Sequence, residues 1–179
     1  MRRFEVIDTP LAGLKVVRRA RLGDRRGYLM RLFCASDLES AGWLKPVAQA
    51  NMTLTLTKGT VRGMHFQNPP HSEMKLVSCL GGEVWDIAVD LRRESSTYLH
   101  WHAERLSPED DKALLIPEGF AHGFQTLTEN CKLLYFHSEY YHPESEGGVN
   151  PLDPVLKIEW PLPITEISPR DAARPMLST

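Results

Sequence analysis

The stretch Asn51-Met52-Thr53-Leu54-Thr55-Leu56-Thr57 (NMTLTLT) alternates apolar and polar side chains at every step. Successive side chains of a strand point to opposite faces, so this period of two predicts a half-buried strand. Similar short runs, rich in Val, Ile, Thr, Tyr, Phe or Trp, lie on both sides of it and predict an all-β chain. The segments expected to form strands are residues 4–7, 14–18, 28–33, 48–57, 60–66, 75–80, 83–91, 97–105, 112–116, 121–126 and 132–139.

Turn residues separate these strands at short intervals, and no linker divides the chain. The pattern predicts one domain, residues 1–179, folded as an antiparallel jelly roll or barrel. Helical signals are few: residues 36–42 predict a short helix with Ser36 as N-cap and Gly42 as its stop, and residues 107–111 predict one helical turn. The Pro-rich tail from about residue 160 is expected to wrap the surface. The expected turns are Pro69-Pro70, Gly81-Gly82, Pro117-Glu118-Gly119 and Gly147-Gly148.

Composition and charge limit the kinds of molecule that the chain is expected to bind. The chain has 179 residues and a formal net charge of -2, which argues against nucleic acid or an anionic membrane surface as partner. Three cysteines, an odd number without a pairing pattern, predict free thiols at Cys34, Cys79 and Cys131. The sequence shows no apolar run of transmembrane length and no signal-peptide core, so we expect a cytoplasmic protein.

Four clusters carry side chains suited to chemistry, at residues 62–67, 117–124, 135–141 and 168–171. On a regular strand, His65 and Gln67 share a face and Arg62 points away from it. Each cluster also has an ordinary structural explanation: a core histidine, a hairpin turn with a surface histidine, an aromatic core strand and a capped turn. Two histidines on strands of one small barrel, His65 and His122, can both point inward, which favours a functional site.

The order of these motifs resembles a known family. The pattern Pro117-x-Gly119-x-x-His122 is similar to the second motif of the cupin superfamily. GTVRGMHFQ at 59–67, KLV at 75–77 and DIAVDLR at 86–92 resemble the dTDP-4-dehydrorhamnose 3,5-epimerase family, and matching motifs continue to about residue 175. The resemblance implies a homodimeric cupin-type jelly roll with no metal or other cofactor. It also implies a nucleotide-sugar substrate, a 4-keto-6-deoxy hexose inverted at C3 and/or C5.

The resemblance assigns roles by position. His65 is similar to the family's general base, Asp171 to the carboxylate that orients it, and Tyr135 to the general acid on the opposite sugar face. Lys75 matches the lysine near the ketone oxygen. The positions that resemble substrate-binding residues are Arg26, Arg31, Gln49, Asn51, Arg62, His122, Tyr141, Glu146 and Arg170; among these Tyr141 would stack on the base, and Arg26 would reach the active site of the partner subunit.

The expected reaction explains why these residue types are needed. A C–H bond beside a ketone loses its proton only if the resulting negative charge spreads onto the carbonyl oxygen. A histidine suits the base, and a lysine suits the developing enolate oxygen. Inversion requires that the proton return from the other face, which a tyrosine can supply. Arginine forks match diphosphate oxygens, and an aromatic face suits a flat base.

The nucleotide positions depart from the family pattern. Arg31 stands where a base-contacting glutamate is expected, and Arg170 where a lysine is typical. Arginine only donates hydrogen bonds, so Arg31 cannot accept the N3–H of thymine, whereas it could meet the acceptors of cytosine. A pairing of Arg31 with solvent or with Asp37 is the simpler alternative. The sequence leaves open the nucleotide and whether C3, C5 or both are inverted.

Two other functions remain as alternatives. A metal-dependent cupin oxygenase usually offers His-x-His, and here that pair, His100 and His102, falls on an expected exposed edge strand. A non-catalytic sugar-nucleotide-binding cupin would have lost the base or the acid, yet both are present. The sequence therefore favours an epimerase.

Overall fold

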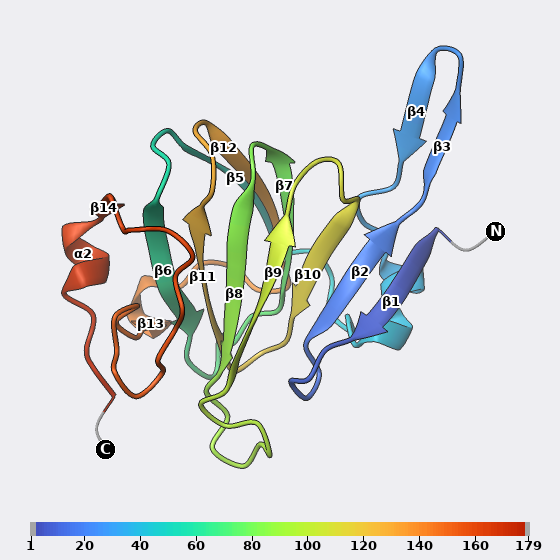
Figure 1. Ribbon diagram of the computed structural model, residues 1–179. Coiled ribbons are helices and arrows are strands. Elements are labelled where there is room, and N and C mark those ends of the chain that lie inside the picture. The colour runs from blue at the N-terminus through green and yellow to red at the C-terminus, as the bar shows by residue number, and fades with distance from the viewer. Residues whose placement is uncertain (1–2, 178–179) are drawn as a thin grey trace.

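The strands of the computed structural model, which describes residues 3–177, form two antiparallel sheets that face each other (Figure 1). The first sheet contains β1 (Phe4–Asp8), β2 (Lys15–Arg19), β5 (Gln49–Thr55), β7 (Lys75–Gly81), β10 (Lys112–Ile116) and β12 (Cys131–His137). The second contains β6 (Thr60–Gln67), β8 (Val84–Asp90), β9 (Trp101–Leu106), β11 (Phe120–Thr126), β13 (Glu146–Gly148) and β14 (Glu166–Ile167). The expected all-β fold is confirmed.

Strand order brings distant parts of the chain together. The first sheet runs β1-β2-β10-β7-β12-β5, and the second runs β13-β6-β11-β8-β9, with the short β14 parallel to β6. β5 and β9 therefore lie at sheet edges, as expected for the segment that carries His100 and His102. β5 pairs with β12 so that Asn51 lies opposite Tyr135.

The main core fills the space between the sheets. Val77, Leu114 and Leu133 point into it from the first sheet, and Ala88 and Phe124 point into it from the second. All five side chains are at most 2% exposed. Burial of apolar area at about 25 cal/mol per Å² makes this layer a main source of stability.

Both sheets are also covered on their outer faces. Leu38 and Trp43, from the segment around the helix α1 (Ala35–Leu38), pack with Leu76 and Leu115 on the first sheet. Val149 and Leu156, from the C-terminal segment, cover the second sheet. This double cover explains why the central strand β7 is buried at five consecutive positions, as strands buried on both faces are.

β5 differs from its prediction in the direction of its faces. The strand forms as predicted, but Met52 is 65% exposed and Leu54 45%, whereas Thr55 is buried. A period of two fixes which side chains share a face, but not which face meets the core. In this single chain the polar face of β5 points inward.

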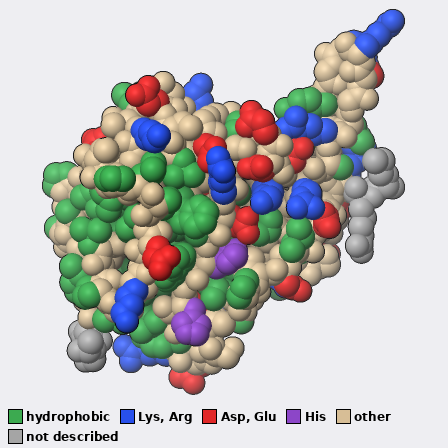
Figure 2. All heavy atoms as spheres, in the orientation of Figure 1, with side chains coloured by type: hydrophobic (Ala, Val, Ile, Leu, Met, Phe, Trp, Pro, Cys, Tyr) green, Lys and Arg blue, Asp and Glu red, His purple; other side chains and the backbone are tan. Residues whose placement is uncertain are grey.

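A separate two-stranded hairpin projects from the body of the molecule (Figures 1 and 2). It consists of β3 (Arg21–Asp24) and β4 (Gly27–Met30), where the sequence predicted one strand at residues 28–33. Tyr28 and Leu29 on the hairpin are 56% and 63% exposed. Basic side chains occupy its tip in Figure 2.

Three local predictions need correction. The helix near residue 36 is capped by Cys34 without a side-chain hydrogen bond, not by Ser36, although Gly42 ends the following 3₁₀ turn η1 (Glu39–Ala41) at φ 103° as expected. Residues 107–111 form a turn rather than a helix. Gly147-Gly148 belongs to β13, because it pairs with Phe66 and His65 of β6. No helix within residues 3–177 is both long and apolar enough to cross a membrane.

Candidate active site

A cavity of about 1040 Å³ opens between the sheets, and eleven of the thirteen predicted site residues line it. They come from β5, β6, β7, β11, β12, the segment after β12 and the C-terminal tail. The eleven are Gln49, Asn51, Arg62, His65, Lys75, His122, Tyr135, Tyr141, Glu146, Arg170 and Asp171. The fold thus brings together positions that are more than one hundred residues apart in the sequence.

His65 and Asp171 form a hydrogen-bonded pair at the cavity wall. His65 Nε2 lies 2.6 Å from Asp171 Oδ1, and the backbone N–H of Gly63 donates to Asp171 Oδ2 at 3.2 Å. Burial raises the pKa of Asp171, but the bonds from His65 and Gly63 outweigh it and hold that pKa below its usual range. The bond to Nε2 leaves Nδ1 of the half-exposed His65 as the nitrogen available to a substrate.

The short helix α2 (Pro169–Ala172) positions Asp171. Ser168 caps it, because its Oγ accepts a hydrogen bond from the backbone N–H of Asp171 at 3.0 Å, and Pro169 occupies the first helical position. The predicted capped turn at 168–171 is therefore present. It places the Asp171 carboxylate of the C-terminal tail beside His65 on β6.

Arg62 lines the same cavity as His65, contrary to the expectation from regular strand alternation. The register between β6 and β11 shifts between the pairs His65–His122 and Arg62–Phe124, so β6 carries one extra residue there. Such a bulge turns residues three apart toward one face. Gly63 sits within it at φ 127°, where an added Cβ would lie 2.6 Å from Gly123 Cα, so only glycine fits.

Lys75 is held by a carboxylate that the sequence did not single out. Its Nζ lies 3.1 Å from Glu73 Oε1 and donates to the carbonyl oxygen of His65 at 3.2 Å. The second oxygen of Glu73 lies 2.8 Å from Nδ1 of His137. Burial raises the pKa of Glu73, but the bond from His137 and the positive charge of Lys75 lower it overall to about 2. Glu73 therefore bridges two cationic or potentially cationic groups inside the cavity.

A signal for Glu73 and His137 was present in the chain. His137 stands two residues after Tyr135 on one strand, so the two share a face, and Glu73 stands two residues before Lys75 in the sequence. The contact between them joins β12 to the loop before β7, and no local pattern predicts it.

Tyr135 lies in the wall, next to a second histidine–carboxylate pair. Its ring meets that of His122 edge-on, with centroids 5.9 Å apart. His122 Nε2 lies 2.8 Å from Asp86 Oδ1, and both side chains are almost fully buried. Burial raises the pKa of Tyr135 well above its usual range, which keeps the phenol protonated at neutral pH.

The mouth of the cavity carries charged and aromatic groups. Tyr141 Oη donates to Glu146 Oε2 at 2.5 Å, and Glu146 also pairs with Arg170 and Arg174. Burial raises the pKa of Glu146, but the bonds from Tyr141 and Arg174 hold it below its usual range. Gln49 accepts a hydrogen bond from the Tyr141 backbone at 3.0 Å.

Two predicted contacts lie outside the cavity. Arg26 sits at the tip of the β3–β4 hairpin, with its side chain 85% exposed, and pairs with Asp24 at 2.6 Å. Arg31 lies 3.2 Å from Asp37, which is the simpler alternative considered for it. Arg31 therefore does not line the cavity of its own chain.

The family model described as dTDP-4-dehydrorhamnose 3,5-epimerase matches residues 8–179. The chain belongs to the dTDP-4-dehydrorhamnose 3,5-epimerase family. The family predicted from the motifs is confirmed, and with it the expectation of an epimerase. The oxygenase and the non-catalytic binding protein are not supported. The His100–His102 pair of the oxygenase alternative lies on or beside β9, away from the residues that line the cavity.

Individual epimerases match most of the chain. It is 39% identical over 173 residues to dTDP-4-dehydrorhamnose 3,5-epimerase of Salmonella typhimurium, covering 96% of this chain and 94% of that protein. The crystal structure of the Bacillus anthracis epimerase with TDP and PPi bound has a TM-score of 0.93 at 34% identity, covering 97% and 99% of the two chains. These matches confirm the cupin-type fold.

The family also contains an enzyme with narrower action. ChmJ, a 3'-monoepimerase from Streptomyces bikiniensis in complex with dTDP-quinovose, is similar to this chain with a TM-score of 0.85 and 31% identity. The match covers 95% of this chain and 86% of that one. Epimerases that share this fold thus differ in the number of centres they invert.

Proposed function

We propose that this epimerase inverts C3, C5 or both in a dTDP-linked 4-keto-6-deoxy hexose through an enolate. The observation that carries the proposal is that the His65–Asp171 pair opens into the same cavity as Lys75 and Tyr135. A base with its orienting carboxylate, a cation and a protonated phenol are the groups that proton transfer beside a ketone requires. Relatives bound to TDP and to dTDP-quinovose support the dTDP-linked substrate.

In this mechanism, Nδ1 of His65 removes the proton from the carbon beside the ketone. The electron pair of the broken C–H bond moves into the carbonyl group and forms the enolate. Asp171 holds Nε2–H and stabilises the imidazolium that results, as in triad logic. The ammonium of Lys75 stabilises the negative oxygen, and Glu73 fixes its position.

Tyr135 returns a proton to the opposite face of the same carbon. Because burial keeps the phenol protonated, it gives up its proton only to a strong base such as the enolate. The product then carries the inverted centre. Afterwards, solvent takes the proton from His65 and restores the one on Tyr135, so the enzyme is unchanged.

The nucleotide is proposed to occupy the mouth of the cavity. Tyr141 would stack on the base, and Arg170 and Arg62 would bind the diphosphate, with Glu146 orienting Tyr141 and Arg170. The roles of Gln49, Asn51 and His122 are proposed as sugar contacts on the basis of their place in the wall.

We further propose that the enzyme is a homodimer. The apolar face of the edge strand β5, formed by Met52 and Leu54 and continued by Leu56 just after the strand, is exposed in one chain. An exposed edge strand is a template for pairing. The projecting hairpin would carry Arg26 to the cavity of a second copy. Light scattering at assay concentration tests the proposal: a fully active monomer contradicts it. The three free cysteines support a reducing compartment such as the cytoplasm.

Solvent isotope exchange tests the mechanism. In D₂O the wild-type enzyme should incorporate deuterium at each carbon that it epimerises, so NMR of the product distinguishes C3, C5 and both. The Tyr135→Phe variant should lose epimerised product more severely than exchange, because proton removal from the first face remains possible. Equal and complete loss of both would contradict the role of Tyr135. Activity should also survive prolonged treatment with EDTA.

A further inference from the structure

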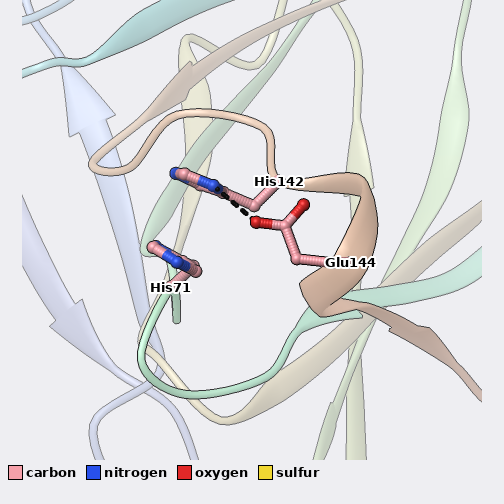
Figure 3. Close-up of side chains that lie close together, drawn as sticks. All are labelled: His71, His142 and Glu144. Carbon is pink, nitrogen blue, oxygen red and sulfur yellow. Dashed lines mark hydrogen bonds and ion pairs between the residues drawn. The ribbon is translucent and has the colours of Figure 1, made fainter.

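Three side chains outside the catalytic cavity converge on one point of the surface (Figure 3). His71 lies on the loop between β6 and β7, His142 follows β12, and Glu144 belongs to the 3₁₀ turn η2 (Pro143–Ser145). The two imidazole rings are stacked with centroids 3.5 Å apart, and His142 Nδ1 lies 3.1 Å from Glu144 Oε1. One ligand atom from each of the three residues lies within 4.8 Å of the others.

A buried glutamine holds the two loops in this arrangement. The amide of Gln67, which is 5% exposed, donates to the carbonyl oxygens of His71 at 2.9 Å and Tyr140 at 3.0 Å. Its own oxygen accepts from the backbone N–H of His142 at 2.7 Å. Asn68 adds a bond from its side chain to the carbonyl oxygen of Ser145 at 3.1 Å. The backbones that carry the two histidines are therefore held in place.

The donor set matches the preferences of borderline divalent metals. Two imidazoles and one carboxylate are a common ligand set for Zn²⁺, at distances of about 2.0–2.2 Å. Ligands of a tetrahedral ion lie roughly 3.3–3.4 Å apart at these bond lengths, so atoms now within 4.8 Å must approach by up to about 1.4 Å. Rotation of the side chains is sufficient, because Glu144 is exposed and the histidines are only partly buried.

We propose that His71, His142 and Glu144 form a surface site for a divalent transition-metal ion of the Zn²⁺ class. The bound ion would join the loop after β6 to the segment after β12, which includes Tyr141 at the mouth of the cavity. The site takes no part in the proton transfers at His65 and Tyr135. Its existence is therefore independent of the proposed mechanism.

Calorimetric titration of tag-free protein with Zn²⁺ tests the site directly. We expect one ion per chain in the wild type, and at least tenfold weaker binding in His71→Ala and in His142→Ala. His102→Ala is the matched control, because His102 forms another surface pair with Glu104 at 3.1 Å but belongs to no cluster of three ligands among the described residues. Equal affinity in wild type and both cluster variants, or an equal loss in His102→Ala, would overturn the proposal.

Glu144→Gln tests the site even if the histidine variants fail to fold. Its side chain is 67% exposed, so the substitution should leave the fold intact while it removes a charged ligand. Zn²⁺ should raise the melting temperature of the wild type, because a ligand that binds only the folded state stabilises it, and should raise that of Glu144→Gln less. An identical shift in both proteins contradicts the site. EDTA should reverse the shift without abolishing epimerisation, which separates this test from that of the mechanism.

Discussion

Two histidine–carboxylate pairs on neighbouring strands of one sheet have nearly the same geometry and opposite exposure. His65 and Asp171 are joined at 2.6 Å, and the His65 side chain is 40% exposed. His122 and Asp86 are joined at 2.8 Å, but their side chains are only 6% and 0% exposed. The first pair leaves Nδ1 of its imidazole available to a substrate, whereas the His122 imidazole is bonded to a fully buried carboxylate and packs edge-on against Tyr135. Exposure, rather than residue type, distinguishes the proposed base from a histidine proposed as a contact in the cavity wall.

His65→Ala removes the open pair and should produce the largest effect. General acid–base groups contribute on the order of 10²–10⁴-fold to a rate, so turnover should fall by about that factor. Deuterium exchange at both carbons should also disappear, because no enolate forms. Stopped assays and NMR in D₂O measure the two losses. The melting temperature should fall less than in His122→Ala, because Asp171 lines the cavity, where water can replace the lost imidazole. A variant that still exchanges deuterium at the wild-type rate would rule out His65 as the base.

Glu73→Gln tests an intermediate case, because the side chains of Glu73 and His137 are about one-tenth exposed. Removal of one partner from a buried ion pair costs roughly 3–5 kcal/mol, here by leaving Lys75 beside a neutral amide. The folded-state pKa of Glu73 is depressed from 4.5 to about 2, so its stabilisation is present above pH 4.5 and is lost as pH falls toward 2. Urea unfolding at several pH values should show the wild-type advantage shrinking across that window. A stability difference between wild type and Glu73→Gln that stays constant with pH would contradict the depressed pKa of Glu73.

His122→Ala breaks the buried His122–Asp86 pair and should act mainly on stability. Asp86 would keep no side-chain partner for Oδ1, and its Oδ2 already lacks one within residues 3–177. A buried polar group left unsatisfied costs about 1–3 kcal/mol, which denaturant unfolding can measure. The loss of stability should exceed that in His65→Ala. If instead His122→Ala folds as stably as wild type and loses deuterium exchange completely, the buried pair is part of the proton-transfer machinery.

Arg31→Glu should have the smallest effect, because the Arg31–Asp37 pair is partly exposed and lies outside the cavity. Exposed ion pairs contribute about 0–1 kcal/mol. The ratio of dTDP to CDP affinity, measured by calorimetry, should therefore be unchanged. A shift of tenfold or more in that ratio would show that Arg31 reads the base, through a second copy of the chain or through movement of its loop.

The sequence predicted where the strands lie better than it predicted which of their side chains point inward. β6, β7 and β12 lie where periodicity and β-propensity placed them, because alternation is a local property of the backbone. Arg62 was the exception: one extra residue in β6 turns it to the side of His65. A bulge depends on how two strands pair, so it cannot be predicted from the side-chain alternation of one strand.

The predicted site residues lie together in the structure, but the sequence did not reveal all of their contacts. His65, Asp171, Lys75 and Tyr135 were identified from motifs, and all four line the cavity. Glu73 was missed because its partner His137 is 64 residues away and only sheet pairing brings them together.

The sequence by itself determined the all-β class, the family and the set of titratable groups, since these follow from local periodicity and from short motifs. Only the tertiary structure decided which groups meet, which are open to solvent and which are closed. Exposure separates the two pairs, because a half-exposed imidazole can pass its proton to solvent after each turnover, whereas a buried imidazole bonded to a carboxylate cannot do so directly. The stack of His71 on His142 has the same origin: two loops 71 residues apart meet because one buried amide, Gln67, binds both.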